Sequence, residues 1–385
     1  MAFNGELEHT VSLRDRQGIK ENKMHARVNH NPSEKSAGDE LVIKMPQLSP
    51  SSVIYAGSLN LTYNYKPSSD AVEADIPDHL TSAIVERFKM VIKGQTVFDT
   101  CNYNHLAIYR ELWHPKHKYA TELTHRGIQS AETKKKRHSL AGAAADVLAG
   151  VHKERYVMQL GSFLTHAAFT PQAIRNSVEF HIKLASGKYS LKNICLEYDY
   201  VNEPNIASGV VQKYTNYRHI FDDYKSHTTT DVPSTASDFE ININATYDSL
   251  RSILILFKAD NDASTTYQNP NITNVKVDID GTTNQLFTSD YLAPYAYADA
   301  SKYFKIDRSE AYVNQETFYT DKYCLAIDLR TINDERASGI GREVKDYIKL
   351  KFSKGVTTAA SKAFVFLVTD KAVEFVNNEL SRILQ

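Results

Sequence analysis

Two aspartates in the second half of the chain have the spacing of a carboxylate pair. Asp278 and Asp280 flank Ile279, and in an extended segment alternate side chains point to the same face. Two carboxylates on one face are an arrangement that acid–base catalysis uses. Asp280 also directly precedes Gly281, however, and aspartate is common in tight turns. We therefore interpret this stretch as a strand that runs into a turn.

Two other groups of polar residues match metal sites only in part. Asp260, Asp262 and Ser264 carry oxygen atoms at alternate positions, but the glycine and the terminal bidentate glutamate of a calcium loop are missing. His114 and His117 flank a Pro-Lys pair and have no further ligands at metal spacing. We prefer a polar strand connection and an exposed loop, so the sequence predicts no metal and no cofactor.

Motifs that mark common enzyme sites are missing from the sequence. It has no Gly-rich phosphate loop with Lys-Ser/Thr, no paired-histidine zinc helix and no nucleophile elbow. Gly339–Arg342 is only a short glycine turn. Cys101, Cys195 and Cys324 are far apart and lack metal spacing, which favours free thiols in a reducing compartment. The chain is therefore predicted not to be an enzyme.

One basic cluster interrupts the otherwise balanced sequence: Lys134, Lys135, Lys136 and Arg137. A compact basic run on an exposed loop is typical of a nuclear-import signal, which would place assembly in the nucleus, or of an anion-binding patch. The alternative is a solvated loop end before an Ala-rich segment that begins near Ser139. Both interpretations stay open.

The composition is that of a globular chain with a preference for β-structure. Hydrophobic residues make up 42% and charged residues 24%, which is ordinary for folded domains. Tyrosine (23) and phenylalanine (16) far outnumber tryptophan (1), and aromatic residues favour pleated, half-buried surfaces. A net charge of −1 gives no general attraction to nucleic acid or to an anionic membrane. No apolar run approaches the roughly 20 residues of a membrane span.

The length predicts two domains behind a polar arm. At about 100–200 residues per domain, 385 residues correspond to two domains. Residues 1–40 have few apolar side chains and no clear period, and their six basic and seven acidic residues nearly cancel. We therefore expect a flexible N-terminal arm over residues 1–40.

Short strands dominate the rest of the chain. Leu59–Tyr65 and Phe239–Ile243 alternate between apolar and polar residues, the period of a strand with one buried face. Ile253–Phe257 is a continuous apolar run, suited to a strand covered on both faces, and Tyr323–Leu329 and Ala363–Val368 are similar. Many short strands with a few helices in the connections predict β-sandwiches of the jelly-roll kind.

A strand–glycine–strand pattern occurs once in each half. Phe88–Asp99 has its turn at Gly94, and the stretch from Thr273 to Phe287 has its turn at Gly281. Glycine adopts the positive φ that tight hairpins require. A helix-like segment follows each hairpin, and the two copies lie about half the chain length apart. This repetition suggests two copies of one architecture.

The middle of the chain changes from strand to helix. From Ile194 to Tyr200 the even positions are apolar or aromatic, and Pro204 suits the first position of a helix. Apolar residues then follow at helical spacing: Ile206, Val210, Val211 and Tyr214. We predict a first jelly roll over residues 41–203, a linker helix over 204–214 that packs through these four side chains, and a second jelly roll over 215–385.

The order of several segments along the chain resembles a known family. In the second half these are Leu191–Asp199 with Glu203 and Pro204, Phe239–Ile243, Leu254–Lys258, Asn269–Val275, Asn284–Leu286, and Phe318–Tyr323 to Asp328–Arg330. In the first half they are Ala56–Leu59, Lys93–Gly94 with Phe98–Asp99, and Tyr109–Trp113. Over roughly residues 50–370 the chain resembles the hexon-type major capsid proteins of Polinton (Maverick) elements and adintoviruses. Residues 1–40 and 134–150 show no clear match.

This resemblance implies an all-β double jelly roll: two eight-stranded β-sandwiches with short helices in the connections and a linker helix between the halves. It also implies a homotrimer that forms a pseudo-hexagonal capsomer of an icosahedral shell, because three copies of two similar sandwiches present six similar edges. The implied partners are neighbouring capsomers and the penton and minor capsid proteins, and the implied location is the virion. The family has no catalytic residues to carry over.

A tandem β-sandwich ligand-binding protein, such as a lectin-like module, would have a similar composition. Exposed aromatic residues in a concave site and a monomeric state would favour that alternative. An enzyme on a jelly-roll scaffold would need convergent histidines or carboxylates, which the sequence does not supply.

Overall fold

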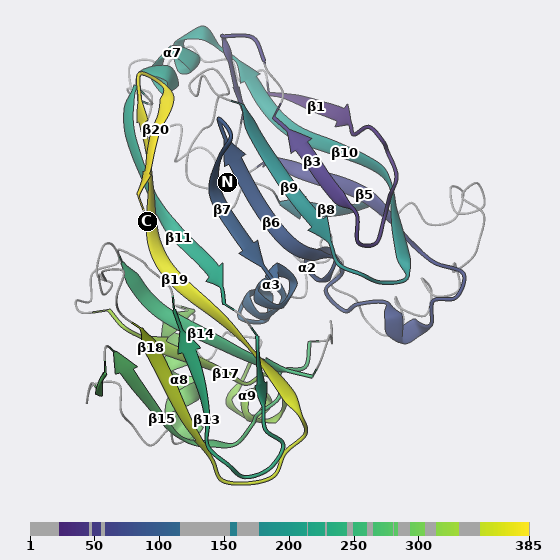
Figure 1. Cartoon of the computed structure of the whole chain (residues 1–385). Coiled ribbons are helices and arrows are strands. Elements are labelled where there is room, and N and C mark those ends of the chain that lie inside the picture. The colour runs from purple at the N-terminus through teal and green to yellow at the C-terminus, as the bar shows by residue number, and fades with distance from the viewer. Residues whose placement is uncertain are drawn as a thin grey trace. The chain divides into compact units, whose positions relative to one another are not determined.

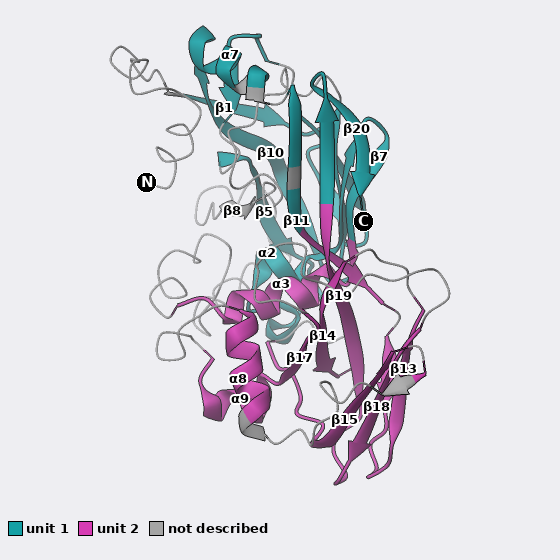
Figure 2. Ribbon diagram, turned by 90° about the vertical axis from the view of Figure 1, so that its left-hand side faces the viewer, with its two compact units in different colours: residues 1–99, 125–221, 372–384 teal, residues 100–124, 222–371, 385 magenta. Residues whose placement is uncertain are grey.

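The computed structural model describes residues 23–45, 48–54, 58–115, 155–159, 177–213, 215–227, 229–244, 249–259, 265–279, 281–283, 293–304, 313–330 and 347–384. These residues form two compact units (Figure 2). Unit 1 comprises residues 1–99, 125–221 and 372–384, and unit 2 comprises residues 100–124, 222–371 and 385. The division differs from the contiguous domains that the sequence predicts, because residues 100–124 belong to the second unit and the C-terminal strands belong to the first.

Ten strands lie in the described residues of the first half, most of them labelled in Figure 1: β1 Lys23–Asn29, β2 Lys35–Ser36, β3 Glu40–Lys44, β4 Ser52–Ile54, β5 Asn60–Pro67, β6 Val85–Ile92, β7 Gln95–Cys101, β8 Arg155–Gln159, β9 Val178–Leu184 and β10 Tyr189–Asn202. A six-stranded sheet has the order β1-β10-β5-β8, with β2 and β4 also paired to β10. A four-stranded sheet has the order β3-β9-β6-β7.

The part of the second half that the structure describes forms ten more strands: β11 Asn216–Ser226, β12 Thr230–Val232, β13 Phe239–Ile243, β14 Leu250–Lys258, β15 Ile272–Ile279, β16 Thr282–Thr283, β17 Cys324–Asp328, β18 Ile348–Lys354, β19 Ser361–Val376 and β20 Glu379–Leu384. The six-stranded sheet has the order β11-β19-β14-β17, with β12 and β20 paired to β19, and the four-stranded sheet has the order β13-β18-β15-β16.

The two pairs of sheets therefore share one strand order for nine strands each. Only β4 and β20, which pair with β10 and β19, occupy different places along the chain. The predicted hairpins are confirmed: β6 and β7 meet at Gly94, with φ of 74°, and β15 and β16 meet at Gly281, with φ of 76°. A helix follows each hairpin, α3 at Tyr103–Leu112 and α8 at Ala293–Tyr303. The repeated pattern in the sequence corresponds to a repeated topology.

The remaining helical elements are short: η2 Glu73–Asp75, α2 Leu80–Ala83, α7 Pro204–Lys213 and α9 Gln315–Asp321. α7 begins at Pro204 as predicted, since proline needs no hydrogen-bond acceptor in the first turn. α8 packs on β17 and contacts α9, so these helices cover one face of the six-stranded sheet of unit 2.

The predicted flexible arm is wrong from residue 23 onward. Lys23–Asn29 forms β1, a strand of seven residues that pairs along its whole length with β10. Lys35–Ser36 forms β2, and β3 begins at Glu40. The structure does not describe residues 1–22. The strand was missed although Met24, Ala26 and Val28 alternate with polar residues, because the low apolar content of residues 1–40 as a whole was taken as the stronger signal.

Candidate functional sites

The predicted carboxylate pair is only half described. Asp278 is buried in β15 and forms an ion pair with Lys351 of β18, with 2.5 Å between Oδ2 and Nζ, whereas Asp280 lies outside the described residues. The hydrogen bond with Asp278 raises the pKa of Lys351, so the lysine is positively charged in the neutral range. Asp278 is therefore a cross-strand pairing residue.

Several other candidate residues from the sequence analysis cannot be placed. Lys134–Arg137, His117, Asp260–Ser264 and Gly339–Arg342 all lie outside the described residues. His114 follows α3, where its backbone N–H donates to the carbonyl of Glu111 at 3.1 Å. Within the described ranges, no group of three or more His, Cys, Asp or Glu side chains is arranged to hold a metal ion. None of the helices described there combines the length and the apolar character that crossing a membrane requires.

The predicted linker helix is α7, and part of its packing face is described. Ile206 is only 2% exposed, as is Ala207, which the sequence analysis did not single out. Val211 is half-buried and Gln212 is exposed, whereas the side chains of Val210 and Tyr214 are outside the described set. α7 contacts β4 of the same unit. Packing through all four predicted side chains remains a prediction.

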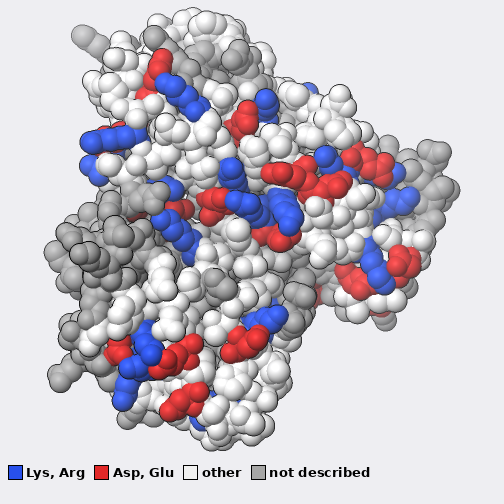
Figure 3. Space-filling model, viewed as in Figure 1, with Lys and Arg blue, Asp and Glu red and all other residues white. Residues whose placement is uncertain are grey.

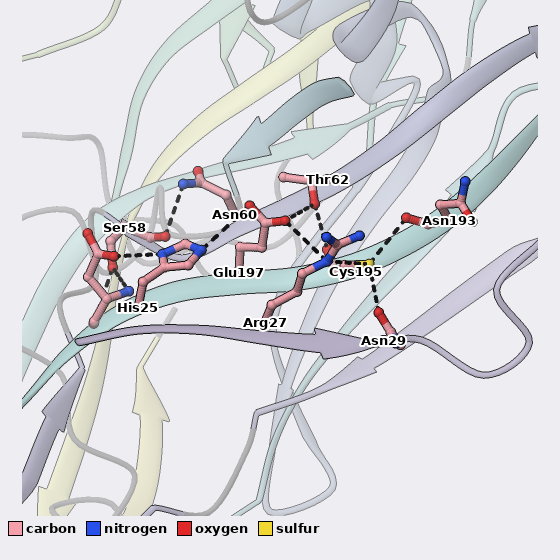
Figure 4. Close-up of polar contacts among 10 residues, drawn as sticks. His25, Arg27, Asn29, Ser58, Asn60, Thr62, Asn193, Cys195 and Glu197 are labelled. Carbon is pink, nitrogen blue, oxygen red and sulfur yellow. Dashed lines mark hydrogen bonds and ion pairs between the residues drawn. The ribbon is translucent and has the colours of Figure 1, made fainter. Parts of the chain in front are cut away.

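A row of polar side chains crosses the six-stranded sheet of unit 1 (Figure 4). The antiparallel register pairs three residues of β1 with three of β10: His25 with Asp199, Arg27 with Glu197, and Asn29 with Cys195. On the other side of β10, Asn60 and Thr62 of β5 are opposite Glu197 and Cys195. We call these eight residues the polar row. Three neighbouring strands thus present polar groups at matching positions on one face.

Contacts within the polar row connect β1 to the sheet. His25 Nδ1 lies 2.9 Å from Asp199 Oδ1, and Arg27 Nε lies 3.7 Å from Glu197 Oε1. Glu197 also accepts a hydrogen bond of 2.9 Å from the hydroxyl of Thr62. Because Glu197 is 20% exposed and His25 is 61% exposed, these pairs are partly screened by solvent, and each one contributes little to stability by itself.

Cys195 is the buried centre of the polar row. Arg27 Nε donates to its sulfur at 3.3 Å, and the thiol donates to Asn29 Oδ1 at 3.1 Å (Figure 4). The hydrogen bond with Cys195, followed by the more distant charge of Glu197, raises the pKa of Arg27. The thiol is engaged on both sides and is 1% exposed. The arrangement therefore fixes an edge strand and leaves no nucleophile open to a substrate.

The outer surfaces carry charges of both signs close together. Figure 3 shows Lys and Arg interspersed with Asp and Glu over the visible face. Cross-strand ion pairs join surface charges of opposite sign, for example Lys183 with Glu86 at 3.2 Å in unit 1 and Lys349 with Glu240 at 2.5 Å in unit 2. No single-sign field dominates this face as far as the described residues show, and such a field is what general attraction to a polyanion needs.

Two similar pairs of sheets, each with a six-stranded and a four-stranded member in the same strand order, define the fold class as an all-β double jelly roll, as the sequence predicted. Short helices lie in its connections.

Solved structures with this fold include virus capsid proteins. VP54 of PBCV-1, fitted into a reconstruction of the virophage Sputnik, aligns with a TM-score of 0.61 and 9% identity over 94% of this chain and 97% of VP54. A chain of the Sputnik virophage structure aligns with 0.59 and 10% over 94% and 89%. The Faustovirus major capsid protein aligns with 0.52 and 9% over 97% of both chains.

Sequence comparison adds no relative to these structures. No protein-family model matches the chain, and no curated protein matches it. With identities of 9–10%, the likeness is one of fold.

Proposed function

We propose that this chain is a major capsid protein, a structural subunit of an icosahedral virus shell. The observation that carries the proposal is the extent of the fold: both pairs of sheets are present, and the likeness spans 97% of the Faustovirus major capsid protein as well as 97% of this chain. A ligand-binding module of two sandwiches would need only one such pair per site. A capsid subunit uses both pairs, because each sandwich supplies one edge of its capsomer.

The proposed assembly is a homotrimer with a pseudo-hexagonal outline. Three copies of two topologically equivalent sandwiches present six similar edges, so closed three-fold symmetry produces a unit that tiles a hexagonal lattice. The same proposal makes neighbouring capsomers and the penton and minor capsid proteins its partners, and the virion its location. A Polinton or adintovirus lineage and nuclear import through Lys134–Arg137 are finer proposals, which rest on sequence segments alone.

The assembly state tests the proposal directly. Size exclusion with light scattering should give three times the 43.5 kDa of one chain, and negative-stain images of that fraction should show hexagonal outlines. A mass near one chain would contradict the capsomer. If that monomer also bound glycans on a glycan array, the lectin-like alternative would replace the capsid proposal.

A further inference from the structure

A cavity of about 220 Å³ lies within unit 2 and is lined by three arginines. Arg110 comes from α3, Arg251 from β14, and Arg330 from the segment just after β17. The hydroxyl-bearing rings of Tyr224 and Tyr303 also line the cavity. These five residues are far apart in the sequence, and the fold of unit 2 brings their cationic and hydroxyl groups together.

Two of the three arginines have carboxylate partners. Arg330 Nε and Nη2 donate to the two carboxylate oxygens of Asp328, at 2.8 and 2.6 Å. Arg251 Nη1 pairs with Asp222, which also lines the cavity, and with Asp370 at 3.2 Å. The Nε of Arg251 is buried and has no hydrogen-bond partner among the described residues. One N–H of the charged Arg251 guanidinium therefore has no acceptor among those residues.

Arg110 is the cation whose charge is not compensated by an ion pair. Its guanidinium lies over the ring of Tyr224, 5.1 Å from the ring centre, and this neighbour is the largest cause that raises the pKa of Arg110. In the described part of the chain no carboxylate forms an ion pair with it, although the charge of Asp222 also contributes to its raised pKa, and the residue is exposed. Arginine presents five donors in a planar fork, so most of its donor capacity is available to a ligand.

The Tyr303 hydroxyl of the lining is neutral and takes part in hydrogen bonds with Tyr224 and Ser252. Burial, followed by the neighbouring Tyr224, raises the pKa of Tyr303 well above its usual value. The phenol therefore stays protonated in the neutral range and adds no negative charge to the cavity. A ligand that accepts hydrogen bonds and carries negative charge matches the donors of Arg110 and Arg251.

We propose that this cavity binds one small oxyanion, a phosphate or carboxylate group, held by Arg110 and by the free Nε of Arg251. Planar arginine forks suit both groups, because two parallel N–H donors match two oxygens of one acceptor. The volume limits the ligand: drug-sized molecules need roughly 300–1,000 Å³, so a compact ion or the acidic end of a longer chain fits. The negative charge of Asp222 repels a bound anion and therefore lowers the affinity of the cavity for it.

Thermal unfolding of the full chain in inorganic phosphate, acetate or chloride, at equal ionic strength, tests the site. A ligand that binds only the folded state raises the midpoint in proportion to ln(1 + [L]/Kd). We expect a saturable rise in phosphate or acetate over chloride, and the larger rise identifies which group the site prefers. The same midpoint in all three salts would overturn the proposal.

Matched variants locate the effect. Arg110→Gln should weaken binding about tenfold or more, since hydrogen bonds to charged groups are worth about 1.5–3 kcal/mol, and Asp222→Asn should strengthen it. Lys276→Gln, an exposed lysine of β15 outside the cavity, should leave the anion-dependent rise unchanged. Because the rise is measured within each variant, a lower intrinsic stability of Arg110→Gln does not hide the result. An undiminished rise in Arg110→Gln would show adventitious screening and refute the site.

Discussion

The two six-stranded sheets share one strand order and complete their outer faces in different ways. In β10 of unit 1 the buried Leu196 and Tyr198 alternate with half-buried Glu197 and Asp199, and the polar row occupies the outer face. In β14 of unit 2 nearly every residue is buried, including the five consecutive residues from Ile253 to Phe257 at 0% exposure. Equivalent topology therefore does not require equivalent burial.

The difference comes from aromatic residues on the helices of unit 2. Trp113, just after α3, stacks on Phe304 with ring centres 5.1 Å apart, and Tyr109 meets Tyr267 edge-on at 4.7 Å. Phe318 of α9 lies 6.2 Å from Trp113. Rings at these distances and angles add to the stability that burial provides. One sheet is thus completed by a hydrophobic helical layer, and the other by cross-strand polar contacts.

Truncating the central ring of the aromatic layer should have the largest effect. Trp113 is 1% exposed, and Trp113→Ala should lower the free energy of unfolding by about 3–5 kcal/mol, because it removes packing and leaves a cavity. Denaturant unfolding followed by circular dichroism measures this. Tyr295→Ala, at a tyrosine of α8 that is 62% exposed, should cost about 0.5 kcal/mol or less. Equal losses would mean that the helical layer does not stabilise unit 2.

Alkaline pH should weaken unit 2 through Cys324. Burial raises the pKa of this thiol to about 12, against about 8.5 in an unfolded chain. Its contribution is therefore complete below about pH 8.5 and declines as the pH rises toward 12, by about 3 kcal/mol at pH 11. Cys324→Ala should flatten the decline between pH 8.5 and 11, whereas Cys101→Ala, at an exposed thiol, should preserve it. Identical pH profiles for the two variants would contradict the assignment.

Disrupting the polar row should lower the free energy of unfolding by a smaller amount. Glu197→Gln removes the charge that faces Arg27 and His25, and we expect a cost of about 1 kcal/mol, since solvent screens these pairs. A double-mutant cycle with Arg27→Gln should give a coupling below about 1 kcal/mol. A coupling several times larger would make the polar row as important to unit 1 as the aromatic layer is to unit 2.

Thiol labelling compares the polar row of unit 1 with the aromatic layer of unit 2 without any substitution. Cys101 is exposed and should react first, while Cys195 in the polar row and Cys324 under the aromatic layer are buried. Because opening a partly solvated polar contact costs less than opening a hydrophobic layer, Cys195 should react before Cys324. Mass spectrometry after timed alkylation gives the order. Faster labelling of Cys324 would reverse the comparison between the two sheets.

Apolar periodicity predicted most strands correctly because it reports burial directly. Leu61 and Tyr63 are buried as their alternation predicts, and the continuous run of β14 is covered on both faces. β1 was missed although Met24, Ala26 and Val28 alternate with polar residues, because that short alternation lies in a segment of low apolar content. Its pairing with β10 is long-range, and no local signal in the sequence shows it.

The cavity of unit 2 could not be predicted for a related reason. Arg110, Arg251 and Arg330 belong to a helix, a strand and a connection that are each separated by roughly 80 residues or more, and no local motif links them. The mixed membership of the units has the same origin. Nothing within residues 100–124 or 372–384 indicates which unit they join, because that depends on long-range pairing.

That membership sets the order in which the units are completed during synthesis. Every segment of unit 2 up to Lys371 is made before Ala372–Leu384, the last segment of unit 1, leaves the ribosome. At about 5–20 residues per second, residues 1–99 wait roughly 15–55 seconds for that final segment. The unit that contains the N-terminal strands is thus the last to close. The sheet that contains β11 and β14 lacks β20 and part of β19 until then. Its open strand edges are the surfaces most prone to intermolecular pairing, so nascent chains need protection until their end has been made.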